Sequence, residues 1–307
     1  MLYNQIKEIP VDIIKEKLEL FFQEDQINKD ITTNTFVDKN KNITAKFVSE
    51  YSGVFCGMNI IENSFSEKVK VQKLIQDGFK IKPETIIANI TGPADEILKK
   101  ERVILNLIQR MSGVATETNQ YAVKGYRKNI KILDTRKTTP GLRIFEKYAT
   151  QCGGGFNHRF DLSKGVMIKD NHISSNENIE KILKKLRTLN VPIQVEIDTI
   201  EQLKKCLQYL EIDAVLLDNM DPETIKECIN IIKDKNQKIF IEVSGGITLK
   251  TLNRFLINNV DAISIGSTTE IITMRNGWCM KEQTDRSRSR TLATNSLNGT
   301  LSPNMSI

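Results

Sequence analysis

Charged residues and glycines follow six short apolar runs in the second half of the chain, and they occur in a fixed order of chemical type. Arg136 and Lys137 follow the first run, and Lys169 follows the second. Glu196 and Asp218 end the next two runs, and glycines follow the last two. A site with this order would bind a polyanion at one side, a divalent cation or sugar hydroxyls in the middle, and a phosphate at the other side.

The cationic part combines TRKTTPGLR at 135–143 with GGGFNHRFDLSKGVMIKDNH at 153–172, which holds both histidines of the chain, His158 and His172. Arginine presents a planar fork of donors that matches a carboxylate, and lysine supplies a compact charge. A solvated basic loop and, for His158, a purely structural histidine are the alternatives. Because Arg136 and Lys169 directly follow buried strands, we favour an anion-binding site.

The two carboxylates, Glu196 and Asp218, end consecutive predicted strands, and neighbouring strands lie about 4.8 Å apart. Two carboxylates so placed repel each other unless a cation lies near them. Mg²⁺ suits such a pair, because it takes oxygen ligands and usually bridges to substrate phosphates. The alternative is helix capping, since Asp198 and Asp218 are each followed by helical sequence. We favour function for Glu196 and leave both interpretations open for Asp218.

The glycines follow the last two runs. We expect Ser244, Gly245 and Gly246 to open a helix after a strand, which leaves backbone N–H groups free to hold a phosphate at the positive end of that helix. Gly266 repeats the arrangement one unit later. A tight turn is the alternative for either segment alone, but two in succession indicate a phosphate site.

The six runs are IKILDT, GVMIKD, PIQVEID, DAVLLDN, KIFIEVSGG and DAISIGS. Each precedes a helical stretch, and apolar strands that alternate with helices predict βα units and a parallel sheet. We predict a barrel with its active site at the C-terminal ends of the strands, because SGG and IGS lie on the last two strands, where barrels often bind phosphate. An open doubly wound sheet is the alternative.

The first half of the chain predicts an α+β module. Apolar residues at helical spacing predict a helix over 11–22, in which Phe21 belongs to the apolar face, and alternation or apolar runs predict strands at 43–50, 70–75 and 84–90. A long helix should start near Pro93, reach about residue 111 and link the two halves. We therefore divide the chain into an N-terminal domain at 1–112, a barrel at 113–280 and a disordered tail at 281–307, where apolar periodicity is lost.

Composition excludes several classes of protein. The 307 residues are 39% hydrophobic and 27% charged, as in an ordinary globular protein, and no apolar run approaches the roughly 20 residues of a membrane helix. Charges interrupt the N-terminal apolar positions, so we expect no secretion signal and a cytoplasmic location. The five cysteines show no close pair, which argues against a disulfide framework or a zinc site. With a net charge of +6 and 6% aromatic residues, nucleic-acid binding is not expected.

The segments ERVILNLIQRMSGVAT, ILDTRKTTPGLR, GGGFNHRFDLSKGVMIKDNHI, VEID, LLDN, VSGGI and ISIG resemble the successive motifs of the quinolinate phosphoribosyltransferase family. The resemblance runs from about residue 10 to residue 266. It implies an N-terminal α/β sandwich followed by an incomplete α/β barrel of six to seven strands. It also implies a glycosyltransferase of NAD (pyridine nucleotide) biosynthesis, which joins quinolinate to 5-phosphoribosyl-1-pyrophosphate and gives nicotinate mononucleotide, pyrophosphate and carbon dioxide.

The resemblance also implies residue roles. It places Arg102 in the active site of a partner subunit, in a homodimer or higher homo-oligomer with shared sites. It makes Lys137, Glu196 and Asp218 the catalytic residues, with Glu196 and Asp218 facing the ribose and Mg²⁺ through substrate oxygens or water. Quinolinate would be surrounded by Arg136, Lys137, His158, Arg159 and Lys169. The 5-phosphate would be held by Ser244, Gly245, Gly246 and Gly266, and Ile265 and Ser267 complete the substrate-binding set.

The chain departs from the family pattern after ISIG. The family usually continues with an Ala-Leu-Thr-His stretch and a segment that returns to the N-terminal domain, whereas this chain continues with Ser267, Thr268, Thr269 and Glu270. Glu270 stands where the family has a histidine near phosphate, so either the local backbone differs or the carboxylate repels the phosphate and weakens its binding. Two alternatives therefore stay open: a phosphoribosyltransferase for another aromatic acid, and a non-catalytic homologue that only binds the acid.

Overall fold

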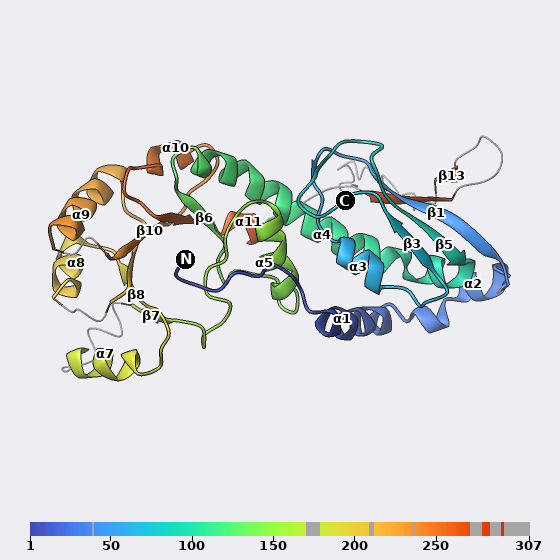
Figure 1. Ribbon diagram of the computed structural model, residues 1–307, viewed down its shortest axis with the longest axis horizontal. Coiled ribbons are helices and arrows are strands. Elements are labelled where there is room, and N and C mark those ends of the chain that lie inside the picture. The colour runs from blue at the N-terminus through green and yellow to red at the C-terminus, as the bar shows by residue number, and fades with distance from the viewer. Residues whose placement is uncertain are drawn as a thin grey trace, which may run out of the picture.

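One helix of 33 residues, α4 (Ala94–Tyr126), runs through both lobes of the molecule (Figure 1). It begins directly after Pro93, as predicted, but it continues well past residue 111. Along this continuation, small residues let neighbouring segments approach the helix closely. A Cβ atom on Gly125, for example, would lie only 2.6 Å from the carbonyl oxygen of Ile130.

The computed structural model describes residues 1–38, 40–169, 179–208, 212–235, 238–270, 278–282 and 290–291. Besides α4, the elements of the first lobe are α1 (Val11–Glu24), η1 (Ile27–Lys29), α2 (Ile31–Phe36), β1 (Asn42–Ser49), β2 (Gly53–Val54), α3 (Met58–Asn63), β3 (Lys70–Lys73), β4 (Lys80–Ile81), β5 (Ile86–Pro93), β12 (Trp278–Glu282) and β13 (Arg290–Thr291). Among the described residues, no helix combines the length and the apolar character needed to cross a bilayer.

The first lobe is a layer of helices on an antiparallel sheet with strand order β13-β12-β1-β5-β3. Its core forms where apolar side chains of β1 and β5, such as Phe47 and Ile90, pack with those of α1, α3 and α4. The predicted helix over 11–22 is present; Phe21 is partly buried and packs against this core, as expected, and Phe22 is buried in it as well. On the opposite face of the sheet the side chains of Thr44 and Thr91 hydrogen bond across strands.

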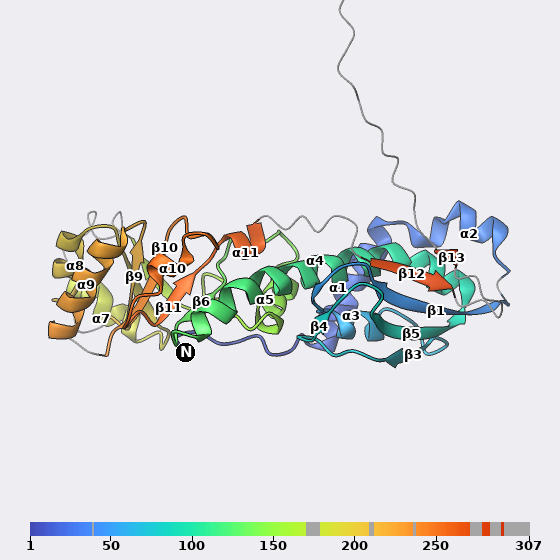
Figure 2. The same cartoon turned by 90° about the horizontal axis from the view of Figure 1, so that it is seen from above.

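The C-terminal part of the chain returns to this first lobe. β12 pairs antiparallel with β1, with Phe47 opposite Met280 (Figure 2). The expectation that no returning segment follows ISIG is therefore wrong. Strand β12 also includes Lys281 and Glu282, beyond the expected boundary at 280, because Cys279 and Met280 are buried and hold the strand in place. Residues 283–289 and 292–307 of the expected tail lie outside the described residues.

The second lobe contains the six predicted strands, all parallel. They are β6 (Lys131–Leu133), β7 (Val166–Ile168), β8 (Ile193–Ile197), β9 (Ala214–Asp218), β10 (Phe240–Ser244) and β11 (Ala262–Ser264). Their order, β6-β11-β10-β9-β8-β7, is that of a barrel left open between β6 and β7, which excludes the doubly wound alternative. The helices of this lobe are α5 (Arg143–Cys152), α7 (Ile179–Arg187), α8 (Ile200–Cys206), α9 (Pro222–Lys235), α10 (Leu252–Phe255) and α11 (Ser267–Glu270).

Side chains alternate along the barrel strands between an apolar and a polar face. In β8, Ile193, Val195 and Ile197 belong to the core shared with the surrounding helices, whereas Gln194 and Glu196 lie on the opposite face. Gln194 is nevertheless fully buried and hydrogen bonded. The barrel interior is therefore lined by polar groups, and these lead to the strand ends where the predicted site residues lie.

The N-terminal segment packs on the second lobe, and the C-terminal strand β12 belongs to the first lobe. The residues before α1 lie against the barrel lobe, where the side-chain amide of Gln5 donates a hydrogen bond to the carbonyl oxygen of Asn157 at 3.0 Å. Strand β12 belongs to the first lobe's sheet. The domain limits expected at residues 112 and 280 remain predictions, and each lobe is completed by the opposite end of the chain.

Two cysteines come together at the junction of the lobes, although their spacing in the sequence did not indicate it. The ligand atoms of Cys56, Cys152 and Asp77 all lie within 4.8 Å of one another, because the segment before α3 meets the end of α5. All five cysteines are free thiols. Asp77 accepts hydrogen bonds from the backbone N–H groups of Gly57 and Met58 and from the hydroxyl of Tyr148.

Candidate active site

A pocket of about 560 Å³ opens at the C-terminal ends of the barrel strands. It brings together most of the predicted site residues, which come from all six strands and from the segment before β7. Those that line it are Arg136, Lys137, His158, Arg159, Lys169, Glu196, Asp218, Ser244, Gly245, Gly246, Gly266 and Ser267. The polyanion, carboxylate and glycine parts predicted from the sequence thus form one continuous site.

The cationic side of the pocket contains donors that no described residue uses. The Nε atoms of Arg136 and Arg159 are both buried without a hydrogen-bond partner. The guanidinium of Arg159 is held from the other side, since its Nη1 donates to the carbonyl oxygen of Gly165 at 2.8 Å. Buried donors without partners are costly, so two arginines in this state favour an anionic ligand that accepts from them.

His158 is buried at the base of this cationic side. Its Nδ1 accepts a hydrogen bond from the backbone N–H of Arg159 at 2.7 Å, which assigns the proton of the neutral ring to Nε2. That nitrogen lies 3.5 Å from a carboxylate oxygen of Glu242. Burial lowers the pKa of His158, and Glu242 opposes this effect. His158 is therefore an oriented, buried group and not a solvated one.

A fully buried ion pair supports the cationic segments from below. Lys147 on α5 donates to Asp134 at 2.6 Å and to the carbonyl oxygen of His158 at 3.1 Å. Asp134 also accepts from the backbone N–H of His158 and from the side chain of Asn157. Burial raises the pKa of Asp134 and lowers that of Lys147, and their mutual attraction opposes both effects. The pair ties the end of β6 to the segment before β7.

Arg110 of α4 fixes the loop that carries Arg136 and Lys137. Its guanidinium donates to Glu146 at 2.9 Å, to the hydroxyl of Thr139 at 3.1 Å and to the carbonyl oxygen of Thr269. Three elements, the loop after β6, α5 and α11, therefore meet at one side chain. The sequence reasoning missed Arg110, because nothing in helical spacing separates it from a solvated arginine.

The carboxylates occupy the middle of the pocket. Glu196 is paired with Lys169, with 2.8 Å between the ammonium nitrogen and a carboxylate oxygen. Carboxylate oxygens of Glu196, Asp198 and Asp218 all lie within 4.8 Å of one another. This group of hard oxygen donors fits a magnesium ion, which is usually held by one or two carboxylates together with substrate oxygens.

Helix capping does not explain these carboxylates. The cap of α8 is Thr199, whose hydroxyl accepts from the backbone N–H of Gln202. Ahead of α9, it is Asp221 that accepts from the backbone N–H groups of Glu223 and Thr224. The capping alternative is therefore wrong for Asp198 and Asp218, and Asp218 instead accepts hydrogen bonds from Ser244 and Asn219.

The glycine loop after β10 does not open a helix directly. α10 begins only at Leu252, so the predicted helix end at Gly245 and Gly246 is absent. Instead both glycines have positive φ, +104° and +56°. A Cβ on Gly245 would lie 2.3 Å from the side-chain oxygen of Asn219, so this backbone approach requires glycine. Gly266, by contrast, directly precedes α11, as expected.

Two residues named from the sequence lie away from the pocket, and for two others the structure gives no description. Ile265 does not line the pocket: its side chain is 1% exposed and packs in the apolar core, because the strand alternation turns it away from the barrel interior. Arg102 lies on α4 and lines a different hollow, between α1 and the loop before α5. His172 and the side chain of Glu270 lie outside the described residues.

Several pocket residues were not found from the sequence. Glu242 and Ser264 lie on the inward faces of β10 and β11, and Met167 lies on that of β7. A signal was available for Glu242, since a carboxylate in the middle of the apolar run KIFIEVSGG has to meet a partner when it is buried. No such signal marks Met167, because methionine in a buried strand ordinarily belongs to a core.

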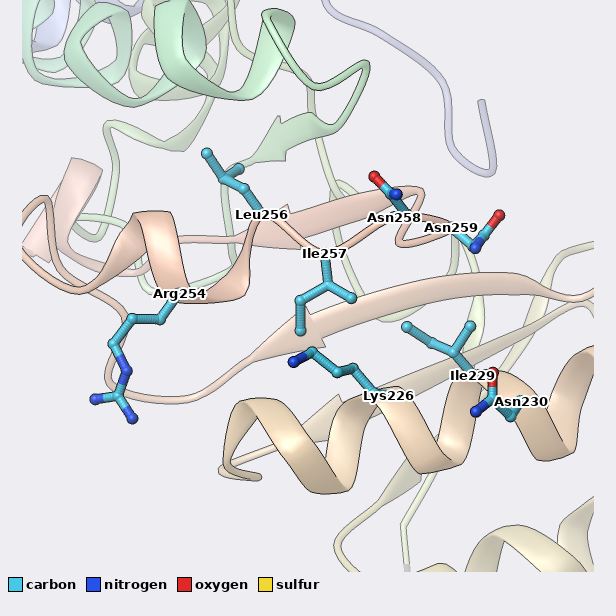
Figure 3. A pocket seen from close by; sticks show the side chains of 8 residues that line it. All are labelled: Lys226, Ile229, Asn230, Arg254, Leu256, Ile257, Asn258 and Asn259. Atoms are coloured by element: carbon cyan, nitrogen blue, oxygen red, sulfur yellow. The ribbon is translucent and has the colours of Figure 1, made fainter.

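A second hollow of about 530 Å³ lies on the outside of the barrel lobe, between α9 and the loop after α10 (Figure 3). It contains two cations, but they do not converge. Figure 3 shows the guanidinium of Arg254 extended away from the other labelled side chains, and Lys226 is paired with Glu223 at 2.8 Å. This hollow lacks the converging donors of the strand-end pocket.

Two family models match consecutive parts of the chain, from residue 30 to residue 274. Residues 30–112 match the model described as quinolinate phosphoribosyl transferase, N-terminal domain. Residues 114–274 match the model described as quinolinate phosphoribosyl transferase, C-terminal domain. The boundary between the two matches falls within α4, the helix that runs through both lobes.

Individual relatives show the same likeness. A probable nicotinate-nucleotide pyrophosphorylase (carboxylating) of Bacillus subtilis is 41% identical over 265 residues, which cover 84% of this chain and 90% of the relative. The solved nicotinate-nucleotide pyrophosphorylase of Francisella tularensis superposes with a TM-score of 0.82 at 32% identity, over 92% of this chain and 100% of that one. The Ehrlichia chaffeensis enzyme of the same name has a TM-score of 0.79 at 34% identity, over 87% of this chain and 98% of that one.

Proposed function

The chain belongs to the quinolinate phosphoribosyl transferase family, and on that premise we propose that it transfers the phosphoribosyl group of 5-phosphoribosyl-1-pyrophosphate to quinolinate. The products are nicotinate mononucleotide, pyrophosphate and carbon dioxide, and the reaction belongs to de novo NAD biosynthesis. The observation that carries the proposal is the strand-end pocket, in which arginine donors without partners, paired carboxylates and a positive-φ glycine loop lie side by side.

Each part of the pocket matches a part of the two substrates. Quinolinate carries two carboxylates, which suit the guanidinium forks of Arg136 and Arg159. Lys137, Lys169 and His158 add further donors around the acid. The 5-phosphate suits Gly266, Ser267 and the loop from Ser244 to Gly246, whose conformation leaves the backbone accessible to an anion.

The transfer step forms a bond between the ring nitrogen of quinolinate and the anomeric carbon as the bond to pyrophosphate breaks. Positive charge develops on the sugar, and carboxylates at the strand ends can stabilise it in a preorganised site. Glu196 and Asp218 have this role in the proposal. Lys169, paired with Glu196, links the carboxylates to the cationic side and holds Glu196 in place.

Decarboxylation follows because the alkylated ring nitrogen is cationic. The C2 carboxylate leaves as carbon dioxide, its bonding electrons pass to the ring, and a proton takes its place at C2. The ring is its own electron sink, so the protein has to orient it and hold the C3 carboxylate. Arg136 and Arg159 are suited to this, because each presents several donors in a fixed plane.

We also propose that Mg²⁺ is required, held through Glu196 and Asp218 and through substrate or water oxygens. The ion would neutralise charge on the departing pyrophosphate. Asp198 was not named among its ligands from the sequence, but its oxygen lies in the same group. Loss of activity in a chelator and its return with added magnesium would test this requirement.

The cytoplasmic location expected from the sequence likewise remains a proposal.

The proposed activity is tested by incubating the purified protein with quinolinate, 5-phosphoribosyl-1-pyrophosphate and magnesium, and by detecting nicotinate mononucleotide and carbon dioxide. Arg136→Lys and Arg159→Lys keep the charge but lose the planar fork, so each should lower kcat/KM for quinolinate at least about tenfold. Lys128→Ala, at the far end of α4 and outside the pocket, is the control. Absence of product with the unaltered protein would rule the proposal out.

A further inference from the structure

The first residues of the chain enter the barrel lobe and reach the underside of the pocket. In Figure 1 the N-terminus is seen through the ring of barrel strands, and Figure 2 shows it at the lower edge of this lobe. Tyr3 is only 5% exposed there. Its ring is stacked on the imidazole of His158, with 4.5 Å between the ring centroids and an angle of 30° between the planes. A residue far from the site in sequence therefore supports a pocket residue directly.

The hydroxyl of Tyr3 starts a chain of two hydrogen bonds that leads to Glu242. It donates to Gln194 Oε1 at 2.8 Å, and Gln194 Nε2 donates to Glu242 Oε2 at 2.8 Å. The other oxygen of Glu242 lies 3.5 Å from His158 Nε2 and has no hydrogen-bond partner among the described residues. His158 and Glu242 line the pocket, whereas Tyr3 and Gln194 lie beneath them.

The segment that carries Tyr3 is fastened next to His158. Asn157 donates its backbone N–H to Gln5 Oε1 at 2.7 Å, and its side-chain oxygen accepts from the backbone N–H of Ile6 at 2.8 Å. Room for the tyrosine ring depends on Gly165, because a Cβ there would lie 2.7 Å from Tyr3 Cε1. The contact between Tyr3 and His158 is thus fixed from both sides.

Resting on the proposed function, we propose that Tyr3 is a positioning residue for quinolinate, which acts through His158 and Glu242 at the floor of the pocket. The stacked ring fixes the plane of the imidazole, and the hydroxyl fixes Glu242 through Gln194. Together they keep His158 Nε2–H directed at Glu242 and close the floor to water. The surroundings of His158 that set its charge are Glu242 on β10, Lys147 on α5, Asp134 after β6, the adjacent Arg159 and Tyr3 itself.

Under the proposed function, the phosphoribosyl donor would occupy the other end of the pocket. The 5-phosphate loop after β10 and the segment at Gly266 make no hydrogen bond to Tyr3 or Gln194 among those found in the described residues. Loss of the tyrosine should therefore change the acid end of the site and leave the donor end nearly unchanged. A change in KM for quinolinate without a change in KM for the donor would distinguish a positioning role of Tyr3 from a general loss of structure.

Three variants of the full chain separate the parts of the contact. Tyr3→Phe keeps the stacked ring and removes only the hydroxyl, Tyr3→Ala removes both, and Tyr126→Ala removes an exposed tyrosine at the end of α4 as a control. Tyr3→Ala should raise KM for quinolinate at least about tenfold, with KM for the donor within about twofold, and Tyr3→Phe should lie between it and the unaltered protein. The control should match the unaltered protein in both constants.

A second measurement follows His158 itself. The chain has two histidines, so substitution of His172 by Gln leaves one imidazole to titrate by NMR. Burial lowers the pKa of His158, and water admitted by Tyr3→Ala should return it towards its ordinary value. An unchanged titration together with an unchanged quinolinate KM would overturn the proposal, as would equal losses for both substrates. If the unaltered protein made no product, the proposed function would fail while the titration still tested the contact.

Discussion

Gly245 is the residue at which the phosphate side of the pocket is most tightly constrained. Its φ of +104° and the 2.3 Å between a Cβ and Asn219 mean that Gly245→Ala has to displace the loop. We expect KM for the phosphoribosyl donor to rise about tenfold or more, with little change for quinolinate. Steady-state kinetics with each substrate varied in turn would measure this.

Gly246 provides the matched comparison. Its φ is +56°, but a Cβ there would meet nothing within 4 Å, so Gly246→Ala faces only the cost of a left-handed alanine, about 1–2 kcal/mol. It should therefore perturb the donor KM less than Gly245→Ala does. An equal effect of the two substitutions would show that the approach to Asn219 does not shape the loop.

Glu101 on α4 makes stability depend on pH. Burial raises its pKa from 4.5 to about 7, and the charge of Arg102 opposes this. Between these two values the folded protein holds a proton that the unfolded chain has lost, so stability should fall as pH rises through this window. Glu101→Gln, which resembles the protonated form, should raise the free energy of unfolding at pH 8 by on the order of 1–3 kcal/mol.

Urea denaturation at pH 5 and at pH 8 would measure the effect of Glu101→Gln. The gain should be present at pH 8 and nearly absent at pH 5. Glu16→Gln, which alters an exposed carboxylate on α1, is the control and should change neither value. A gain of the same size at both pH values would contradict the assignment to a buried, titrating carboxylate.

Strand β12 is the element whose packing is most open to a direct test. Met280 is fully buried in the core of the first lobe, although it lies near the C-terminal end of the described chain. Met280→Ala should lower the free energy of unfolding by about 2–4 kcal/mol, since it leaves a cavity. Lys281→Ala removes only an ion pair with the exposed Glu84 and should cost less than about 1 kcal/mol.

Local patterns in the sequence were enough to predict the barrel elements but not every boundary. All six βα strands were located, because each buried strand is a short apolar run bounded by polar residues. The full length of α4 was not, since beyond residue 111 its buried face includes Ser112, Gly113 and Thr118, which are not read as an apolar stripe. β12 was missed because its pairing partner, β1, lies more than two hundred residues away.

Charged residues at strand ends could be predicted from the sequence. Residues that contact the pocket from distant parts of the sequence could not. Arginine, lysine and carboxylates at strand ends have few structural reasons to be there, so the sequence was enough to predict that Arg136, Lys169 and Glu196 lie together in the pocket. Tyr3 and Arg110 act through contacts with distant segments, and their neighbours in the sequence carry no sign of this. Only the three-dimensional structure brings them to the pocket.

At the scale of the assembly, a site shared between subunits, with Arg102 reaching the partner's pocket, remains a prediction. Arg102 lines the hollow between α1 and the loop before α5, and it does not line the strand-end pocket of its own chain. We expect Arg102→Ala and Lys137→Ala to be inactive separately and to recover about a quarter of the activity per site when mixed subunits pair at random. No recovery, with mixed dimers shown by mass spectrometry, would exclude the shared site.

Because each lobe contains a segment from the opposite end of the chain, the order in which the segments are synthesised affects folding. On the ribosome the N-terminal residues emerge first, yet Tyr3 has no His158 to stack on until the barrel has been made. The sheet of the first lobe likewise keeps β1 unpaired on one side until β12 emerges. The sheet of the first lobe therefore cannot be completed until residues 278–282 have been made, and until then β1 is an open edge that a chaperone could cover.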